Sequence, residues 1–344
     1  MAEKRRSEIK VKAITKVGIV VRDVEKVARN YWNVLGIGPW DIITTSPELR
    51  DRTYRGKPAY FEAKIGFAKV GAVDLVLLEP LEGQSIYRDF LDQRGEGANH
   101  IQYSSDSFED FNRDMEVYPE KGIPVLMSGK IGRDICFAYM DTIDTLKAIW
   151  EPMKTGKWPV PVTRYPAGES AESPARIKVK AINQVSLSVK NLEVVMGNYT
   201  NLLGIGGWKV YEVAPPTLHG HTYRGRIGAF SMRVALTNVG PIELEIIQPV
   251  AGDSVYSDHI SKYGEGINHL SFTTDSVEKA TEIMEEEGFP LLQSGHAIGN
   301  DYFAYFDTVG PLKVIWEAWE PPKGDTSAGP GASIDLSVIT RIVK

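Results

Sequence analysis

Apolar and polar residues alternate along residues 9–23, and this period of two predicts a β-strand. The next stretch, residues 24–35, has apolar residues at helical spacing and ends at Gly36, a residue typical of helix C-termini. Further strands are predicted at residues 40–45, 59–70 and 73–78. Pro80 follows the last of them, where proline ends a strand. The first unit is therefore predicted to run strand, helix, strand, strand, strand.

A second unit of the same order opens at residues 95–103, which read GEGANHIQY. The glycines predict a turn, and the histidine stands at the start of an alternating strand. A helix is predicted at residues 107–121. Three short strands follow, at residues 124–128, 135–141 and 146–151.

The whole pattern occurs a second time in the chain. GEGANHIQY returns as GEGINHLSF at residues 264–272, so that His100 and His269 lie 169 residues apart. VKAITKVGIVVRD returns as VKAINQVSLSVKN, and LKAIWEP as LKVIWEA. A repeat this long indicates a duplicated domain and not a solenoid.

The repeat divides the chain into two domains, residues 1–154 and 177–320. Residues 155–176 between them are rich in Pro, Gly and Ser with little apolar periodicity, which predicts a linker. Residues 321–344 form a tail. Its last part, residues 334–344, alternates well enough to predict a final strand.

Composition and charge narrow the class of protein. The chain has 344 residues, 42% of them hydrophobic and 24% charged, as is ordinary for a soluble globular protein. A net charge of −6 argues against a general nucleic-acid or anionic-membrane surface. We expect neither a secretory signal nor a membrane span, because no long apolar run is present. Cys136 is the only cysteine, which excludes an internal disulfide and a cysteine-rich zinc site, so a cytoplasmic setting is expected.

Two strand-helix-strand-strand-strand units per half, with GEGxNH opening the second, resemble the vicinal oxygen chelate superfamily. The nearest group is that of methylmalonyl-CoA epimerase and glyoxalase I, and the resemblance covers residues 9–153 and 177–320. It implies an α+β fold of tandem duplicated domains, each with two βαβββ modules that close into a half-open eight-stranded cup. It also implies a divalent metal ion, held by the first and last strands of each module.

The four ligand positions of the family can be found in each half. In the first half they hold Lys16, Val76, His100 and Glu151. In the second half they hold Gln184, Glu245, His269 and Glu317. A lysine ammonium has no lone pair and a valine offers no donor atom, so the first-half site is predicted to be degenerate. The second half is predicted to hold the metal.

One nitrogen and three oxygen ligands suit Mn²⁺, Co²⁺, Ni²⁺, Zn²⁺ or Mg²⁺. The set departs from the two-histidine, one-carboxylate face of non-haem iron oxygenases, so iron is less favoured. The resemblance implies that the metal stabilises an enolate by chelating adjacent substrate oxygens. Glu245 or Glu317 would then remove a proton α to a carbonyl. Epimerisation, isomerisation and lyase chemistry all follow from that step.

Three further histidines, His219, His221 and His296, are candidates for acid–base or substrate contacts, with a solvent-exposed loop as the alternative. His259 is expected at the surface, and His100 is expected to be a structural relic.

Other functions stay open. They are a non-haem iron ring-cleaving or keto-acid dioxygenase, a thiol transferase, and a non-catalytic small-molecule binding or resistance protein. The substrate is expected to be a small carbonyl compound, either aromatic or polyketide-like or an acyl-CoA. The resemblance also suggests a homodimer.

Overall fold

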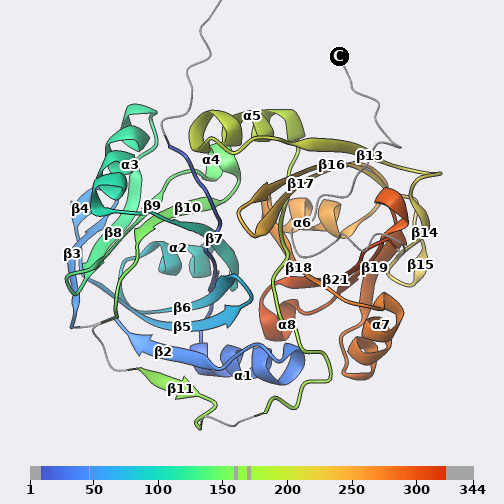
Figure 1. The fold of residues 1–344 in the computed structure, drawn as a ribbon, viewed down its shortest axis with the longest axis horizontal. Coiled ribbons are helices and arrows are strands. Elements are labelled where there is room, and N and C mark those ends of the chain that lie inside the picture. Colours follow the sequence, from blue (N-terminus) through green and yellow to red (C-terminus); the bar gives the residue numbers. More distant parts are fainter. Residues whose placement is uncertain (1–8, 46, 159–161, 169–171, 323–344) are drawn as a thin grey trace, which may run out of the picture.

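The computed structural model describes residues 9–45, 47–158, 162–168 and 172–322, which form two sheet domains side by side (Figure 1). The strand predicted at residues 334–344 lies outside the described residues. No helix in the described ranges is long and apolar enough to cross a membrane.

The first domain contains one sheet of eleven strands. The strands are β1 Lys16–Val20, β2 Trp40–Thr44, β3 Leu49–Tyr54, β4 Lys57–Pro58, β5 Phe61–Val70, β6 Val73–Gly83, β7 Gly97–Ser104, β8 Val125–Ile131, β9 Ile135–Met140, β10 Ile149–Lys154 and β11 Thr163–Tyr165. Their order across the sheet is β11-β2-β5-β6-β1-β7-β10-β9-β8-β3-β4. The first strands of the two modules, β1 and β7, are therefore neighbours at the centre.

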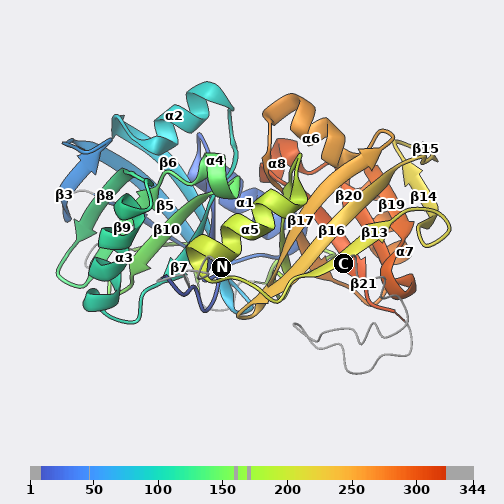
Figure 2. The same cartoon turned by 90° about the horizontal axis from the view of Figure 1, so that it is seen from above.

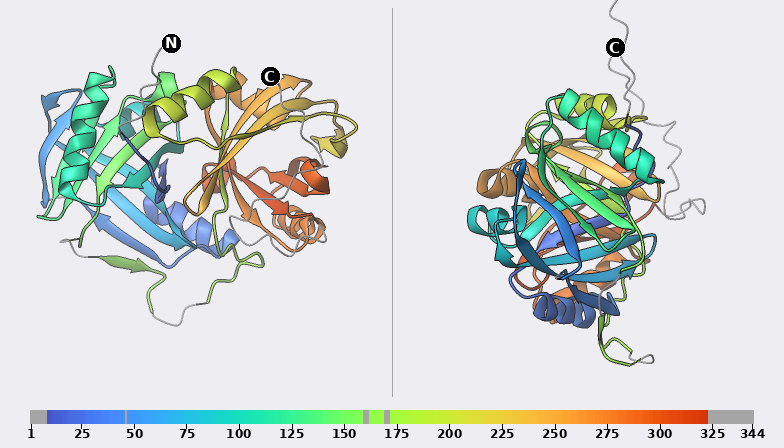
Figure 3. Two further views of the ribbon diagram at one scale, coloured as in Figure 1. Left: turned by 45° about the horizontal axis from the view of Figure 1, so that its top comes forward. Right: turned by 90° about the vertical axis from the view of Figure 1, so that its left-hand side faces the viewer.

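The second domain repeats this order in a sheet of ten strands. The strands are β12 Gln184–Ser188, β13 Lys209–Val213, β14 His219–Tyr223, β15 Arg226–Ile227, β16 Ser231–Val239, β17 Ile242–Ala251, β18 Gly266–Thr273, β19 Leu291–His296, β20 Tyr302–Phe306 and β21 Ile315–Glu320. The order is β13-β16-β17-β12-β18-β21-β20-β19-β14-β15. Each sheet curls into a half-open cup (Figure 3), so the predicted fold class is confirmed.

The helices cover the outside of the cups and the seam between them. They are α1 Val24–Leu35, α2 Ile86–Gln93, α3 Phe108–Glu120, α4 Ile143–Leu146, α5 Leu192–Leu203, α6 Val255–Tyr263, α7 Val277–Glu286 and α8 Val309–Leu312, with a short 3₁₀ turn η1 at Ile298–Asn300. The side chain of Asp23 accepts a hydrogen bond from the Lys26 N–H and fixes the start of α1. Gly36 ends α1 in the left-handed conformation, at φ 66°.

Helices at the seam join the domains through matched contacts (Figure 2). The Tyr31 hydroxyl on α1 donates to the Leu312 carbonyl on α8 at 2.7 Å, and the Tyr199 hydroxyl on α5 donates to the Leu146 carbonyl on α4 at 2.9 Å. Both tyrosines are fully buried, and one apolar core runs through both domains.

The segments before β1 and β12 cross to the opposite domain. Residues 9–15 were predicted as part of the first strand, but β1 begins only at Lys16. The Val11 N–H instead donates to the Leu203 carbonyl at 3.0 Å, and the Val179 N–H donates to the Leu35 carbonyl at 2.8 Å. Each domain therefore contributes an extended segment to the packing of the other.

Candidate metal centre

The four predicted ligands of the second half meet on neighbouring strands. β17, β12, β18 and β21 are adjacent in the sheet and carry Glu245, Gln184, His269 and Glu317 respectively. The Nε2 atom of His269 lies 3.4 Å from an oxygen of each of the other three side chains. Donor atoms that share one ion at about 2.1 Å are expected about 3 Å apart when they are adjacent. Each of the three oxygens therefore lies slightly farther from His269 Nε2 than two adjacent ligands of one ion would.

The polar environment of His269 fits a cation at this point. The imidazole Nδ1 lies 2.8 Å from the Asn268 side-chain oxygen, so Nδ1–H donates there and Nε2 is the ring nitrogen that faces the carboxylates. Burial disfavours a charged imidazole, but the two glutamates outweigh it and raise the pKa of His269 to about 9. Glu245 Oε2 is buried and accepts no hydrogen bond of normal geometry within the described residues. The residues present therefore fit a divalent metal ion.

The ligand set opens onto a cavity of about 760 Å³. Its wall contains apolar and aromatic side chains: Met232, Val234, Leu236, Phe303, Tyr305 and Trp319. Its mouth carries the exposed lysines Lys178, Lys180, Lys209 and Lys279. A cavity of this size and lining is typical of a small-molecule site.

The equivalent cup of the first half is nearly filled. Its cavity measures only about 40 Å³, and Trp158 packs on Phe67 at its lining, with ring centroids 4.9 Å apart. The Lys16 ammonium is buried 5.4 Å from the centre of the Phe67 ring. Burial lowers the pKa of Lys16, although Glu151 acts in the opposite direction. A side-chain cation thus lies in the region where the second half has room for an ion.

The two ligand-position histidines also differ in their surroundings. His100 Nε2 lies 3.4 Å from Glu151 Oε2, which corresponds to the contact between His269 and Glu317 in the second half. The His100 ring lies over Gly18, where an added Cβ would come within 1.9 Å of the ring. The second half has Ser186 at this position, paired with His269 in the same register. The His269 ring therefore cannot lie over its partner strand as the His100 ring does.

Comparison with known proteins agrees with this architecture. The family description "Glyoxalase/Bleomycin resistance protein/Dioxygenase superfamily" matches the chain twice, at residues 15–139 and 183–306. The chain belongs to this superfamily. The resemblance to vicinal oxygen chelate proteins is thereby confirmed, and members of this superfamily bind a divalent metal.

Individual relatives are distant. YqjC of Bacillus subtilis (strain 168), an uncharacterized protein, is 22% identical over 149 residues, which cover 42% of this chain and 94% of that protein. A mutant of 4-hydroxymandelate synthase from Streptomyces coelicolor has a TM-score of 0.60 at 14% identity, with 91% of this chain and 93% of that chain covered. A Mn(II)-bound glyoxalase from Novosphingobium aromaticivorans has a TM-score of 0.46 at 15% identity, covering 90% and 82% of the two chains. The synthase structure supports the fold assignment.

The structure does not bring the three further histidines to the ligand set. His219 and His221 lie on strand β14 and not in a loop, and none of the three lines the cavity. His219 pairs with His296 across β14 and β19, and their rings stack at 5.1 Å. The His221 ring packs against Phe230 at 5.1 Å. These contacts give the three histidines a packing role, and their predicted catalytic role has no contact to support it.

The expectation that His259 lies at the surface is wrong. The residue is half-buried on α6, and its Nε2 is enclosed without a hydrogen-bond partner among the described residues. Burial, followed by the positive charge of Arg94 from the first domain, lowers the pKa of His259 to about 4. The helix faces the domain seam, which the local sequence does not show.

Two acids beside the ligand set were not predicted. Glu243 accepts a hydrogen bond from the Gln184 amide at 2.8 Å, and burial raises the pKa of Glu243 to about 7. Asp301 lines the same cavity and accepts hydrogen bonds from the Ala297 N–H at 3.0 Å and the Trp319 indole N–H at 2.9 Å. Burial raises the pKa of Asp301 to about 7. The first half has the apolar Ile135 at the place of Asp301, a difference that is visible in the repeat.

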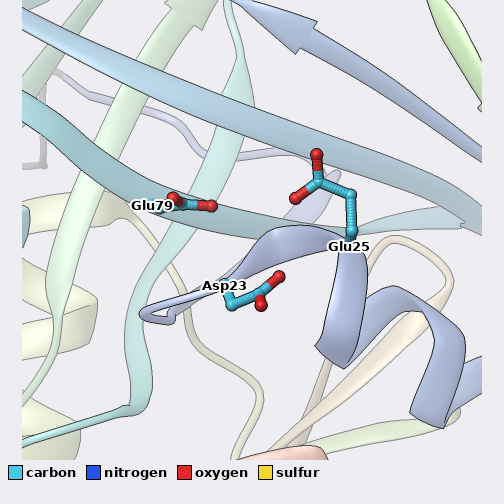
Figure 4. Close-up of side chains that lie close together, drawn as sticks. All are labelled: Asp23, Glu25 and Glu79. Carbon is cyan, nitrogen blue, oxygen red and sulfur yellow. The ribbon is translucent and has the colours of Figure 1, made fainter.

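A separate acidic group lies at the start of α1 (Figure 4). The carboxylates of Asp23, Glu25 and Glu79 offer oxygens that all lie within 4.8 Å of one another. Asp23 caps α1, Glu79 accepts the Val24 N–H at 3.0 Å, and Glu25 pairs with Lys64 at 2.9 Å. The group therefore serves the helix start. Within the described residues, this is the one group of three or more such side chains whose ligand atoms all lie within 4.8 Å of one another, so the second-half ligand set is wider.

Proposed function

We propose that the chain is a divalent-metal enzyme that removes a proton α to a carbonyl in its second domain. The observation that carries the proposal is the arrangement of Gln184, Glu245 and Glu317 around His269 Nε2, at the floor of the large cavity. These four side chains would hold the ion. When bound, the ion would supply electrophilic stabilisation of negative charge that develops on the substrate carbonyl oxygen.

The chain itself supplies the groups that move protons. Glu245 and Glu317 line the cavity next to the position where substrate oxygens would bind, so either carboxylate can accept the proton. Asp301 is a second acid on the cavity wall, with a pKa near neutrality that suits both proton uptake and release. A second acid in the same cavity supports epimerisation or isomerisation, which return a proton to the substrate after one is removed.

The remaining wall binds and orients the substrate. Tyr256 donates its hydroxyl hydrogen bond to Tyr305 at 2.8 Å, and burial raises the pKa of both phenols well above the ordinary value. They therefore stay neutral. Phe303 and Trp319 exclude water from the reacting carbon. A single histidine among the ligands disfavours iron-dependent oxygen chemistry, which typically uses two.

The proposal is tested by proton exchange in deuterated water. The protein, loaded with Mn²⁺, Co²⁺, Ni²⁺ or Zn²⁺, would be incubated with 2-oxo acids, thioesters bearing an α-hydrogen, and aryl ketones. We expect NMR to show loss of the α-proton signal of at least one class. Glu317→Gln should reduce the rate about 100-fold or more, as for loss of a general base. Glu151→Gln, the matched change in the first half, should leave it unchanged.

Two other results would contradict the proposal. Absence of exchange with every metal and substrate class would remove the proton-abstraction mechanism. Oxygen consumption by iron-loaded protein would instead assign oxygenase chemistry to this cavity.

A further inference from the structure

Gln184 differs from the other three ligands because its side chain has two chemically different ends. The amide oxygen can bind a metal, whereas the amide NH₂ group has no lone pair to offer and carries partial positive charge. A flip of the amide by 180° would therefore turn a ligand into a repelling group. Something must select the productive orientation.

Glu243 stands where it can make that selection. Gln184 and Glu243 are direct partners in the parallel pairing of β12 with β17. Glu243 and Glu245 are two residues apart on β17, so their side chains leave the same face of the sheet. Both residues line the cavity. Glu243 is therefore placed beside the ligand set without belonging to it.

The hydrogen bond between the two side chains has a fixed sense. The Gln184 amide NH₂ donates to Glu243 Oε1, so the amide oxygen is the end turned toward the ligand set. The Gln184 Nε2–Glu243 Oε1 distance is 2.8 Å, and Gln184 Oε1 then lies 3.4 Å from His269 Nε2. The flipped amide would set two oxygens against each other at one end and NH₂ against the cation at the other.

The first half shows what the same strand pair does without a metal site. Lys16 and Asp74 occupy the matching register of β1 and β6. The acid there faces a lysine, and its oxygen lies 3.7 Å from the ammonium of Lys69. An acid thus stands opposite the first ligand position in both halves, but only in the second half does it face an amide.

We propose that Glu243 is a positioning residue that holds the Gln184 oxygen toward the metal and thereby sets the affinity of the site. This inference rests on the proposed function, because it requires the ion that Gln184 would ligate. Outer groups that orient ligands typically change metal affinity 10- to 100-fold when they are removed.

The experiment measures the Mn²⁺ dissociation constant of the full chain by EPR detection of free Mn²⁺. Glu243→Leu is expected to weaken binding at least tenfold. Glu243→Gln keeps an acceptor oxygen for the Gln184 amide, so its dissociation constant should stay within about threefold of wild type. Asp74→Leu, the matched change in the first half, should have no effect. Glu243→Ala replaces Glu243→Leu if the leucine variant does not fold.

A second background separates orientation from charge. Gln184→Glu provides a ligand whose two oxygens are equivalent, so no orientation needs to be selected. In that background Glu243→Leu should no longer weaken Mn²⁺ binding. The positioning role would be overturned if Glu243→Leu reduced Mn²⁺ affinity equally in both backgrounds, or if Glu243→Gln bound Mn²⁺ as weakly as Glu243→Leu. Either result would indicate a charge effect.

The outcomes also distinguish this inference from the proposed function. Wild type that fails to bind Mn²⁺, Co²⁺, Ni²⁺ or Zn²⁺ overturns the metal enzyme itself. If wild type binds Mn²⁺ and Glu243→Leu binds it with the same dissociation constant, only the positioning role is overturned.

Discussion

One buried position shows how the two domains have diverged. Near the histidine–glutamate pair, the first domain places the Lys16 ammonium, and the second places an amide and a further carboxylate. The Lys16 ammonium places a positive charge near Glu151, whereas the positive charge beside Glu317 and Glu245 is that of a protonated His269. Two side-chain differences therefore separate a filled core from the proposed cation site.

Asp301 leads to a pH-dependent prediction for the metal-free protein. Its pKa is about 7 in the folded chain and near 3.8 ordinarily, so between these pH values the folded state binds more protons than the unfolded state. The contribution of Asp301 to the free energy of unfolding therefore falls as pH rises from about 4 to about 7. Relative to that of Asp301→Asn, the free energy of unfolding of the wild-type protein should fall by about 2 kcal/mol between pH 5 and pH 7.5.

Urea denaturation at the two pH values measures this difference. Asp134→Asn, an exposed change in the corresponding loop of the first domain, serves as the control and should show no such trend. An equal pH dependence for wild type and Asp301→Asn would show that this carboxyl is not perturbed in the folded chain.

At the scale of elements, local signals decided what could be predicted. The helices at residues 24–35 and 107–121 match α1 and α3 to within a residue at each end, because apolar spacing and caps define them. Helix α2 and the β3–β4 hairpin were missed since they are short. Strand β11 lies in the segment predicted as a linker, and its three residues are ordered by pairing with β2.

The same reasoning explains the candidate site. The four ligand positions were implied by the resemblance to the family, and the structure brings their side chains together on adjacent strands. The role of Glu243 could not be predicted from the sequence, since it depends on which residue of β12 lies opposite Glu243. Asp301 could not, because it reaches the cavity through the η1 turn, where Gly299 and Asn300 have positive φ. The sequence also could not show that His219 stacks on His296 and that His221 packs against Phe230, outside the lining of the cavity.

The paired central strands give a prediction about packing. Gly18→Ala would place a Cβ within 1.9 Å of the buried His100 ring, so it should reduce the free energy of unfolding by about 1–3 kcal/mol. Ser186→Ala at the matching position of β12 removes a buried hydroxyl that has no hydrogen-bond partner among the described residues, and it should be neutral or stabilising. Urea denaturation of the two variants compares them directly. A Gly18→Ala protein as stable as Ser186→Ala would contradict the different packing of His100 and His269.

At the scale of the molecule, two copies of one domain share a core but differ in the size of their cavities. Residues 9–15 and 177–183 cross between the domains, and buried tyrosines join their helices, so the first domain supports the position of the second. A cavity of about 760 Å³ belongs to one cup and a cavity of about 40 Å³ to the other. The chain should therefore act as a single-site protein with a structural partner domain.

Elemental analysis of the purified chain tests this account most directly. Wild type, Glu245→Ala, His269→Ala and His100→Ala would each be refilled with divalent metal, desalted and measured. We predict one ion per chain in wild type and in His100→Ala, and loss of the ion in the two second-domain variants. Two ions per chain, an ion lost with His100, or no ion in any protein would contradict a single metal centre in the second domain.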